Sequence, residues 1–462
     1  MDYRTEKDAL GEKKIPAEKY WGIHTQRALE NFPLSGLCVF PGLIRALTTV
    51  KKAACLANQE LGYLSGPKAK AITSACDEVL EGRFTDSWPL DALQGGAGTS
   101  TNMNMNEVLA NRAIELLGGT KGQYGLVHPI EDVNMHQSTN DVYPTAVKVA
   151  AILGCRALSE TVAKLQGSFQ QKEKEFAGIV KIGRTELQEA VPMTLGAEFA
   201  AFAEAFARDR WRTFKCEERL RVVNLGGTAI GTGLAAPQRY IFLVTEKLRQ
   251  ITGLGLSRSE NMVDATANAD AFVEVSGILK AHASNLVKIA SDLRLMNLLG
   301  EIRLPQLQTG SSVMPGKINP VILEAVMQAG LKVMANDLLV TEAASRATLQ
   351  ICEFMPLLAH ALLESIDLLT RTDEMFAMHV AGIRADSEKC QSYLDQSEGI
   401  MTAFVPRLGY DKAAELLKTF KASGGKNLRE FLEEHLGKEI VAKTLSPQNL
   451  LSLGHKDYGK NA

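Results

Sequence analysis

The 462-residue sequence has no excess of charge of either sign and no long apolar run. Its 51 lysine and arginine residues oppose 53 aspartate and glutamate residues, which leaves a formal net charge of −2. This balance argues against a protein that binds nucleic acid or a membrane surface, because the field that would attract a polyanion is missing. No stretch approaches the roughly 18 apolar residues that would span a bilayer. Residues 1–14 lack the apolar core of a signal peptide, so we expect a cytoplasmic protein.

Patterns that bind metals or nucleotides are also missing. The seven cysteines are scattered and include no CxxC pair, so they fit reduced thiols better than a disulfide framework or a zinc site. None of the eight histidines forms an HxxxH, HxH or HExxH pattern. The glycine-rich segment 224–233 lacks GxGxxG spacing after a strand, and no GKS or GKT follows a glycine loop. We therefore expect no metal, and the sequence argues against dinucleotide and P-loop sites.

Apolar residues at helical spacing dominate what is present. Phe199, Phe202 and Phe206 recur at intervals of three and four, which places them on one face of a helix. Residues 270–299 contain no proline and repeat apolar positions over a broad face. Alternating strand patterns are short and few. The sequence therefore predicts a mainly α protein whose central region, from about 140 to 390, consists of very long helices.

These helices have wide apolar stripes, and such stripes need several neighbouring helices to cover them. A single chain supplies few neighbours of that kind. We therefore expect a homo-oligomer built around a shared helical core, with a monomeric helical bundle as the alternative.

Four polar segments that contain glycine or proline interrupt the helical pattern: 95–107, 134–145, 181–194 and 308–320. They are rich in serine, threonine and asparagine, and we expect them to lie at helix starts. The N-terminus of a helix favours anions through its free N–H groups and partial positive charge. Any one of these residues alone is most simply a helix cap or a turn residue. Four similar segments exceed what capping requires, so we interpret them as parts of a pocket for a small carboxylate-bearing molecule.

Several of these segments resemble a known family. GSSVMPGKINP at 310–320 is similar to the signature of the aspartase/fumarase superfamily, and GTSTNMNMNEVLANRA and QSTNDVYPT resemble its aspartase branch more than its fumarase branch. YWGIHTQRALENFPLSG near the start and GIMTAFVPRLGYDKAA near the end are also similar to family segments, so the resemblance runs almost end to end.

The resemblance implies a mainly α, three-domain subunit with a central bundle of long helices that assembles into a homotetrameric helical core. On that basis we expect an N-terminal helical domain at 1–139, a central long-helix bundle at 140–390 and a small C-terminal helical domain at 391–462. Each active site would be shared between subunits. The substrate would be a small carboxylate or amino acid, with no nucleic-acid or membrane partner.

The resemblance also implies a reaction, the anti elimination of a group from a succinyl-type skeleton. A proton on carbon beside a carboxylate is weakly acidic, so the doubly charged aci-carboxylate must be stabilised as it forms, and preorganised neutral donors do this well. By resemblance four hydroxyl residues would hold that carboxylate: Thr99, Ser138, Thr139 and Ser312. The other carboxylate would be held by Thr185, Lys317 and Asn319, with Asn140 nearer the leaving group. No organic cofactor is expected, because the carboxylate itself accepts the electrons.

Ser311 would be the general base. A serine hydroxyl is a poor base at its ordinary pKa, so it must act as an alkoxide or nearly so. Backbone N–H groups of the glycine-rich loop and the nearby Lys317 would supply the positive potential. We expect this loop to close over the substrate, with Gly310 and Gly316 permitting the required backbone angles.

Some residues depart from the family pattern. Glu186 stands where fumarases have histidine and aspartases have histidine or glutamine, and an anion there favours a cationic leaving group unless a nearby lysine or arginine neutralises it. His136, Cys352 and Glu353 are further departures. Our preferred interpretation is L-aspartate elimination to fumarate and ammonia. The alternatives are an amine lyase for a bulkier or N-methylated substrate such as ergothioneine (releasing trimethylamine and thiourocanate), a fumarate hydratase, and a superfamily member kept only as a structural protein.

Overall fold

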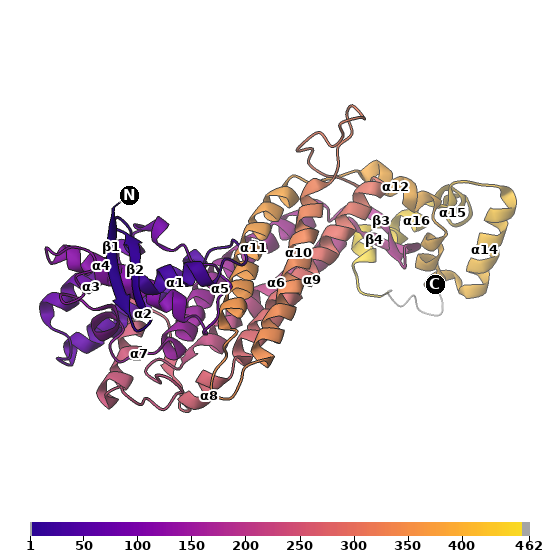
Figure 1. Cartoon of the computed structure of the whole chain (residues 1–462). Coiled ribbons are helices and arrows are strands. Elements are labelled where there is room, and N and C mark those ends of the chain that lie inside the picture. Colours follow the sequence, from indigo (N-terminus) through magenta and orange to yellow (C-terminus); the bar gives the residue numbers. More distant parts are fainter. Residues whose placement is uncertain (1, 455–462) are drawn as a thin grey trace. The chain divides into compact units, whose positions relative to one another are not determined.

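The computed structural model describes residues 2–454 and is predominantly helical (Figure 1). Within these residues five helices have 25 residues or more: α5 (Thr139–Glu175), α6 (Leu195–Leu220), α9 (Asp270–Leu299), α10 (Val321–Ser345) and α11 (Met355–Ala381). α9 coincides with the proline-free segment 270–299. The prediction of a mainly α protein with very long central helices is confirmed.

Shorter helices make up most of the remaining chain. They are α1 (Ile23–Asn31), α2 (Pro41–Glu60), α3 (Gly66–Leu80), α4 (Thr99–Leu116), α7 (Gln238–Thr252), α8 (Met262–Ala267), α12 (Ser387–Gln396), α13 (Val405–Leu408), α14 (Tyr410–Ser423), α15 (Leu428–Leu436), α16 (Lys438–Thr444) and α17 (Pro447–Leu450). Three single-turn or irregular helical segments, η1, η2 and η3, span Thr85–Ser87, Pro129–Val133 and Glu398–Phe404.

Strands occur only in pairs within the described part of the chain. β1 (Tyr3–Asp8) pairs antiparallel with β2 (Gly11–Pro16), and β3 (Val180–Thr185) pairs antiparallel with β4 (Gln188–Thr194). The two-residue strands are β5 (Val222–Val223), parallel to β6 (Ser257–Arg258), and β7 (Ile302–Arg303), antiparallel to β8 (Arg384–Ala385). The segment 181–194 is therefore a hairpin and not the helix start that we expected, because its residues pair across a two-residue turn.

By its internal contacts the chain divides into two compact units. The first unit comprises Met1–Ser159, Trp211–Ala281 and Lys332–Leu369, and the second unit comprises Glu160–Arg210, His282–Leu331 and Thr370–Ala462. Both units draw on segments that are distant in sequence. The three-domain division at 139/140 and 390/391, which runs along the sequence, stays a prediction.

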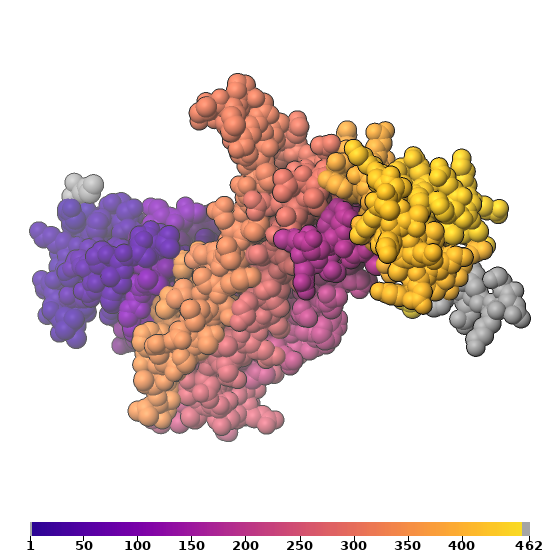
Figure 2. All heavy atoms as spheres, turned by 90° about the vertical axis from the view of Figure 1, so that its right-hand side faces the viewer, coloured from indigo at the N-terminus to yellow at the C-terminus, as the bar shows by residue number. Residues whose placement is uncertain are grey.

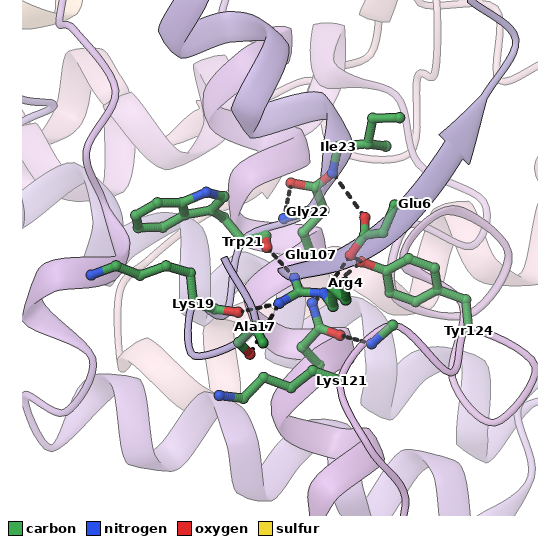
Figure 3. A network of polar contacts seen from close by, with 12 residues as sticks. Arg4, Glu6, Ala17, Lys19, Trp21, Gly22, Ile23, Glu107, Lys121 and Tyr124 are labelled. Carbon is green, nitrogen blue, oxygen red and sulfur yellow. Dashed lines mark hydrogen bonds and ion pairs between the residues drawn. The ribbon is translucent and has the colours of Figure 1, made fainter. Parts of the chain in front are cut away.

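In the first unit, buried carboxylates hold the start of α1. Glu107 of α4 accepts hydrogen bonds from the backbone N–H groups of Gly22 and His24, each at 2.8 Å. Glu6 of β1 accepts the N–H of Ile23 at 2.9 Å (Figure 3). A Cβ atom at Gly22 would lie 2.6 Å from Glu6 Oε2 and 2.9 Å from Glu107 Cδ, so only glycine fits there. These contacts tie the N-terminal hairpin and α4 to α1.

In the second unit, aromatic side chains fill the space between the long helices. Phe169 of α5 packs against Phe199, Phe202 and Phe206 of α6, with ring centroids 5.3 to 5.9 Å apart. Phe376 of α11 packs against the same ring at 5.6 Å. The helical face predicted from the phenylalanine spacing is therefore a core face. None of the helices in the described residues 2–454 is long and apolar enough to cross a membrane.

Candidate active site

Two helix N-termini lie against each other in the first unit. α4 begins at Thr99 and α5 begins at Thr139. Gly98, directly before α4, has a φ of +93°, and a Cβ there would lie 2.6 Å from the ring of Tyr143 on α5. Only glycine allows this approach. The partial positive charges of both helix N-termini therefore add in one region, which favours an anion.

The predicted residues at the start of α5 form a connected set. The Ser138 hydroxyl oxygen accepts the N–H of Asn140 at 3.2 Å, and the Asn140 side-chain amide donates to the carbonyl of Ala229 at 2.7 Å. The Thr139 hydroxyl oxygen accepts a hydrogen bond from the side-chain amide of Asn102 at 3.1 Å. Thr139 is buried, whereas Thr99 at the start of α4 is exposed.

The glycine-rich segment 224–233 supports this set. Asp141 accepts the backbone N–H groups of Gly226 and Thr228 at 3.0 and 3.2 Å, and Asn224 donates to the backbone carbonyl of Asn140 at 2.9 Å. A Cβ at Gly231 would lie 2.3 Å from the carbonyl oxygen of Met262, so the segment needs glycine to pass there. Segment 224–233 therefore braces the start of α5, a role that its sequence did not indicate.

Beneath the start of α5 lies a buried lysine that the sequence reasoning missed. Lys51 of α2 is fully buried, and its Nζ donates to the side-chain oxygens of Asn134 and Gln137 at 2.8 and 2.9 Å. Burial lowers the pKa of Lys51 to about 7, although the nearby Asp141 carboxylate acts in the opposite direction. Burial likewise raises the pKa of Asp141 to about 6. The sequence does contain a signal for this buried charge, because Lys51 lies within the apolar stripe of α2.

In the second unit, Thr185 and Glu186 lie at the exposed tip of the β3–β4 hairpin. Glu186 and Leu187 form its two-residue turn with φ values of +53° and +62°, and Thr185 pairs with Gln188 across it. Such left-handed angles are costly for residues other than glycine, but a tight two-residue hairpin turn favours them at both central positions. Glu186 makes no ion pair with any residue of the described chain.

Buried charges anchor this hairpin. Lys181 donates to Glu198 and Glu301, each at 2.6 Å, and Arg184 donates to Glu301 at 2.5 Å. Glu301 is fully buried. The two basic residues of β3 are therefore paired with other carboxylates, while Glu186 faces a cavity of about 510 Å³ that Lys181 and Arg184 also line.

The segment 308–320 is an irregular loop before α10 and projects from the helices beside it (Figures 1 and 2). The Ser311 hydroxyl oxygen accepts the backbone N–H groups of Val313 and Met314 at 3.1 and 2.7 Å. Two N–H dipoles aimed at one hydroxyl oxygen stabilise negative charge on it, as an alkoxide requires. Ser312 and Lys317 are exposed.

The base of this loop is closed by local bonds. Gly310 donates its N–H to the carbonyl of Lys317 at 2.7 Å, and the Asn319 side chain donates to the carbonyl of Gly310 at 3.0 Å. Gly316 has a φ of +79°, as expected for a residue that permits unusual angles. Gly310 was expected to provide backbone freedom. Glycine is needed there for space, because a Cβ at Gly310 would lie 2.8 Å from Asn319 Nδ2.

The structure thus gathers the predicted residues into three groups. Thr99, Ser138, Thr139 and Asn140 belong to the first unit, whereas the second unit carries Thr185 and Glu186 on the hairpin and Ser311, Ser312, Lys317 and Asn319 on the loop. Within the described residues no hydrogen bond or ion pair joins the hairpin tip to the loop. Across residues 2–454 no group of three or more histidine, cysteine, aspartate or glutamate side chains could hold a metal ion.

The other departures from the family pattern make local contacts. His136, with a φ of +60°, has Nδ1 at 2.7 Å from Asn58 Oδ1. Cys352 is buried, and Glu353 accepts hydrogen bonds from the N–H and hydroxyl of Thr348. These three side chains are therefore held in place by residues close to them in the fold.

A family model described as lyase matches residues 11–335, and the chain belongs to this family, within the aspartase/fumarase superfamily. The superfamily resemblance is therefore confirmed, and the chain is an enzyme.

Two aspartate ammonia-lyases are similar to this chain over nearly its whole length. An aspartate ammonia-lyase from Pseudomonas aeruginosa is 46% identical over 459 residues, covering 97% of this chain and 97% of its own. An aspartate ammonia-lyase from a Bacillus species is 44% identical over 461 residues, covering 98% of each.

Two solved structures have the same fold as this chain. The crystal structure of a fumarate lyase:delta crystallin from Brucella melitensis, bound to cobalt, has a TM-score of 0.93 and 46% identity, covering 96% of this chain and 99% of that one. A class II fumarase from Schistosoma mansoni has a TM-score of 0.91 and 31% identity, covering 98% of this chain and 100% of that one.

Proposed function

We propose that this lyase converts L-aspartate to fumarate and ammonia by anti elimination through an aci-carboxylate carbanion. The observation that carries the reaction type is the Ser311 hydroxyl oxygen, held between the N–H groups of Val313 and Met314. The substrate is supported by aspartate ammonia-lyases that are 44% and 46% identical over nearly the whole chain.

In this proposal Ser311 removes a proton from the substrate carbon beside one carboxylate. The electron pair of that C–H bond moves into the carboxylate, which then carries two negative charges. Hydroxyl donors and helix N–H groups stabilise this charge, and loss of one such donor costs about 3 kcal/mol in comparable sites. The electron pair then returns to form the trans double bond as the C–N bond breaks and ammonia leaves.

The other residues take roles according to their chemistry. Four hydroxyl side chains hold the carboxylate that gains charge: Thr99, Ser138, Thr139 and Ser312. The second carboxylate is bound by Thr185, Lys317 and Asn319. Asn140 and Glu186 face the ammonium group, because an amide oxygen and a carboxylate both attract a cation. The Glu186 carboxylate disfavours an anionic leaving group, which supports ammonia elimination over hydration of fumarate.

We further propose that the chain acts in the cytoplasm as a homotetramer whose active sites combine residues of different subunits. Large apolar side chains on the long helices support self-association, because they are exposed in the single chain: Trp211 and Phe214 at 64%, Leu338 at 60%, Leu298 at 80% and Met378 at 73%. Native mass spectrometry tests the subunit number. Trp211→Asp combined with Phe214→Asp is expected to lower both the assembled mass and the activity, and a monomeric, fully active protein would contradict the proposal.

The substrate is tested by ultraviolet absorbance with L-aspartate, L-malate and ergothioneine offered separately to the purified chain. Fumarate and thiourocanate absorb at different wavelengths, so each product is distinguishable. Fumarate from L-aspartate, with ammonia released in equal amount, is the expected result. Thiourocanate from ergothioneine alone, fumarate from L-malate alone, or no product from any of the three would overturn the proposed substrate.

A further inference from the structure

We propose that Lys51 is a positioning residue that sets the direction of the hydrogen bonds leading to Thr139 and so leaves the Thr139 O–H free to donate to the substrate carboxylate. This inference rests on the proposed function, because it assumes that Thr139 binds that carboxylate. Lys51 itself is buried beneath the start of α5 and acts through two asparagine side chains.

The chain of contacts is continuous within the first unit. Lys51 Nζ donates to Asn134 Oδ1 at 2.8 Å. The same oxygen accepts a hydrogen bond from Asn102 Nδ2 at 3.2 Å. Asn102 Nδ2 also donates to Thr139 Oγ1 at 3.1 Å. Both hydrogens of the Asn102 amide are therefore used, one on each side.

Lys51 is the member of this chain whose role cannot reverse when it is charged. An asparagine amide can turn over and exchange its donor and acceptor, and a threonine hydroxyl can rotate, but an ammonium group only donates. Lys51 therefore requires an oxygen from Asn134. That oxygen also accepts from Asn106 Nδ2 at 3.2 Å, and Asn102 can bond to it only through its own NH₂ group. Thr139 in turn must accept from Asn102, so its own hydrogen is directed elsewhere.

The opposite orientation of Asn102 would serve the site badly. Its oxygen would face Thr139, which would then donate into the protein and present only lone pairs to an incoming carboxylate. In the observed orientation Asn102 Oδ1 has no hydrogen-bond partner among the described residues. The orientation of Asn102 is therefore not selected by its own oxygen. It is selected by Asn134, whose oxygen accepts from Lys51 and whose Nδ2 donates to the carbonyl of Gln137 at 3.2 Å.

Lys148 provides a matched control. It lies on α5, the helix that carries Thr139, and is also buried, with Nζ donating to the carbonyl of Val222 at 2.6 Å. Within residues 2–454 Lys148 makes no hydrogen bond to Asn102, Asn134 or Thr139. Lys148→Met removes a buried lysine of the same unit without touching the network.

The test is a double-mutant cycle measured as kcat and KM on L-aspartate. Thr139→Val removes the proposed donor, and we expect kcat/KM to fall roughly 100-fold, as for loss of one such donor. Lys51→Met should lower kcat/KM by at least about 10-fold. The double variant should lie within about threefold of Thr139→Val alone, because coupled residues are not additive. Lys148→Met should stay within about twofold of the unchanged protein.

A second cycle separates positioning from general damage. Lys51→Met combined with Thr185→Val, which lies in the second unit, should show additive losses. Additive losses in the Thr139 cycle, or equal coupling to Thr185, would overturn the inference. If circular dichroism shows that Lys51→Met does not fold, Asn102→Ala replaces it, and the same coupling to Thr139→Val is expected.

The two proposals fail in different ways. An unchanged protein that forms no fumarate from L-aspartate refutes the proposed function. An active protein in which Lys51→Met leaves kcat/KM unchanged refutes the role of Lys51 alone.

Discussion

His282 of α9 lies with Nε2 at 3.0 Å from Asp373 Oδ1 of α11, and its other ring nitrogen lies 3.0 Å from Asp209 Oδ2 of α6. All three side chains are buried in the second unit. A carboxylate can only accept, so a ring with a carboxylate on each side must carry a hydrogen on both nitrogens. His282 is therefore a buried imidazolium that links three long helices.

This cluster predicts a pH dependence of stability. The two carboxylates raise the pKa of His282 to about 10, against the opposing effect of burial, from an unfolded value of about 6.5. Because the folded pKa is the higher one, the stabilisation is complete below pH 6.5 and is lost as the pH rises towards 10. We expect His282→Gln to remove that decline and to lower the free energy of unfolding at pH 7 by about 3–5 kcal/mol.

Urea unfolding at intervals between pH 6 and 10 measures both effects. The exposed His435 serves as the control, and His435→Gln should keep the decline. A His282→Gln protein whose stability falls with pH as steeply as before would show that His282 is not the titrating group.

Ser311→Ala tests the general base. We expect kcat for L-aspartate to fall about 10²–10⁴-fold, because that is the contribution of a positioned base. The affinity for L-aspartate, measured by calorimetry, should change little, since the carboxylate donors remain. Ser345→Ala, on the exposed end of α10, should leave both quantities unchanged. Turnover near the normal rate in Ser311→Ala would remove Ser311 from its proposed role.

Glu186→Gln tests the leaving-group end of the site. Loss of the negative charge should weaken the attraction for a substrate ammonium group, and we expect kcat/KM for L-aspartate to fall about 10-fold, corresponding to about 1.4 kcal/mol. Glu189→Gln is the matched control, because Glu189 is also exposed and lies on the same hairpin. Equal kcat/KM values for both variants and the unchanged protein would mean that Glu186 only forms the turn.

Glu107→Gln tests the network at the start of α1. Its carboxylate accepts the N–H groups of Gly22 and His24 and also the Thr25 hydroxyl at 2.6 Å. An amide presents one NH₂ group to these donors, and each buried donor left without an acceptor costs about 1–3 kcal/mol. We expect a loss of about 3 kcal/mol in thermal or urea unfolding. The exposed Glu131→Gln should change stability by less than about 0.5 kcal/mol, and an equal loss in both variants would contradict this account.

Local features of the fold could be predicted from the sequence because they depend on neighbours along the chain. The proline-free segment 270–299 forms a single helix, and the spacing of Phe199, Phe202 and Phe206 places their rings in one core face. The hairpin at 181–194 was missed, since its turn uses Glu186 and Leu187 at positive φ, where asparagine and glycine are the usual signal.

Site residues divide in the same way. The hydroxyl-rich segments around Ser138 led to the prediction of a carboxylate pocket, because helix starts of this kind favour anions, whereas the role of Ser311 as a base was predicted from the superfamily resemblance. Lys51 and Asp141 were missed, although a lysine within an apolar stripe was visible. The sequence does not show which distant residues will bond to a buried charged side chain.

The sequence by itself determined the superfamily and the long helices, because motif and periodicity are properties of the chain. Only the tertiary structure decided which side chains distant in the sequence meet. Lys51 and Asn134 are 83 residues apart, and His282 lies 73 residues from Asp209 and 91 from Asp373. Contacts over such separations arise only when packed helices exclude water and force buried polar groups to satisfy one another.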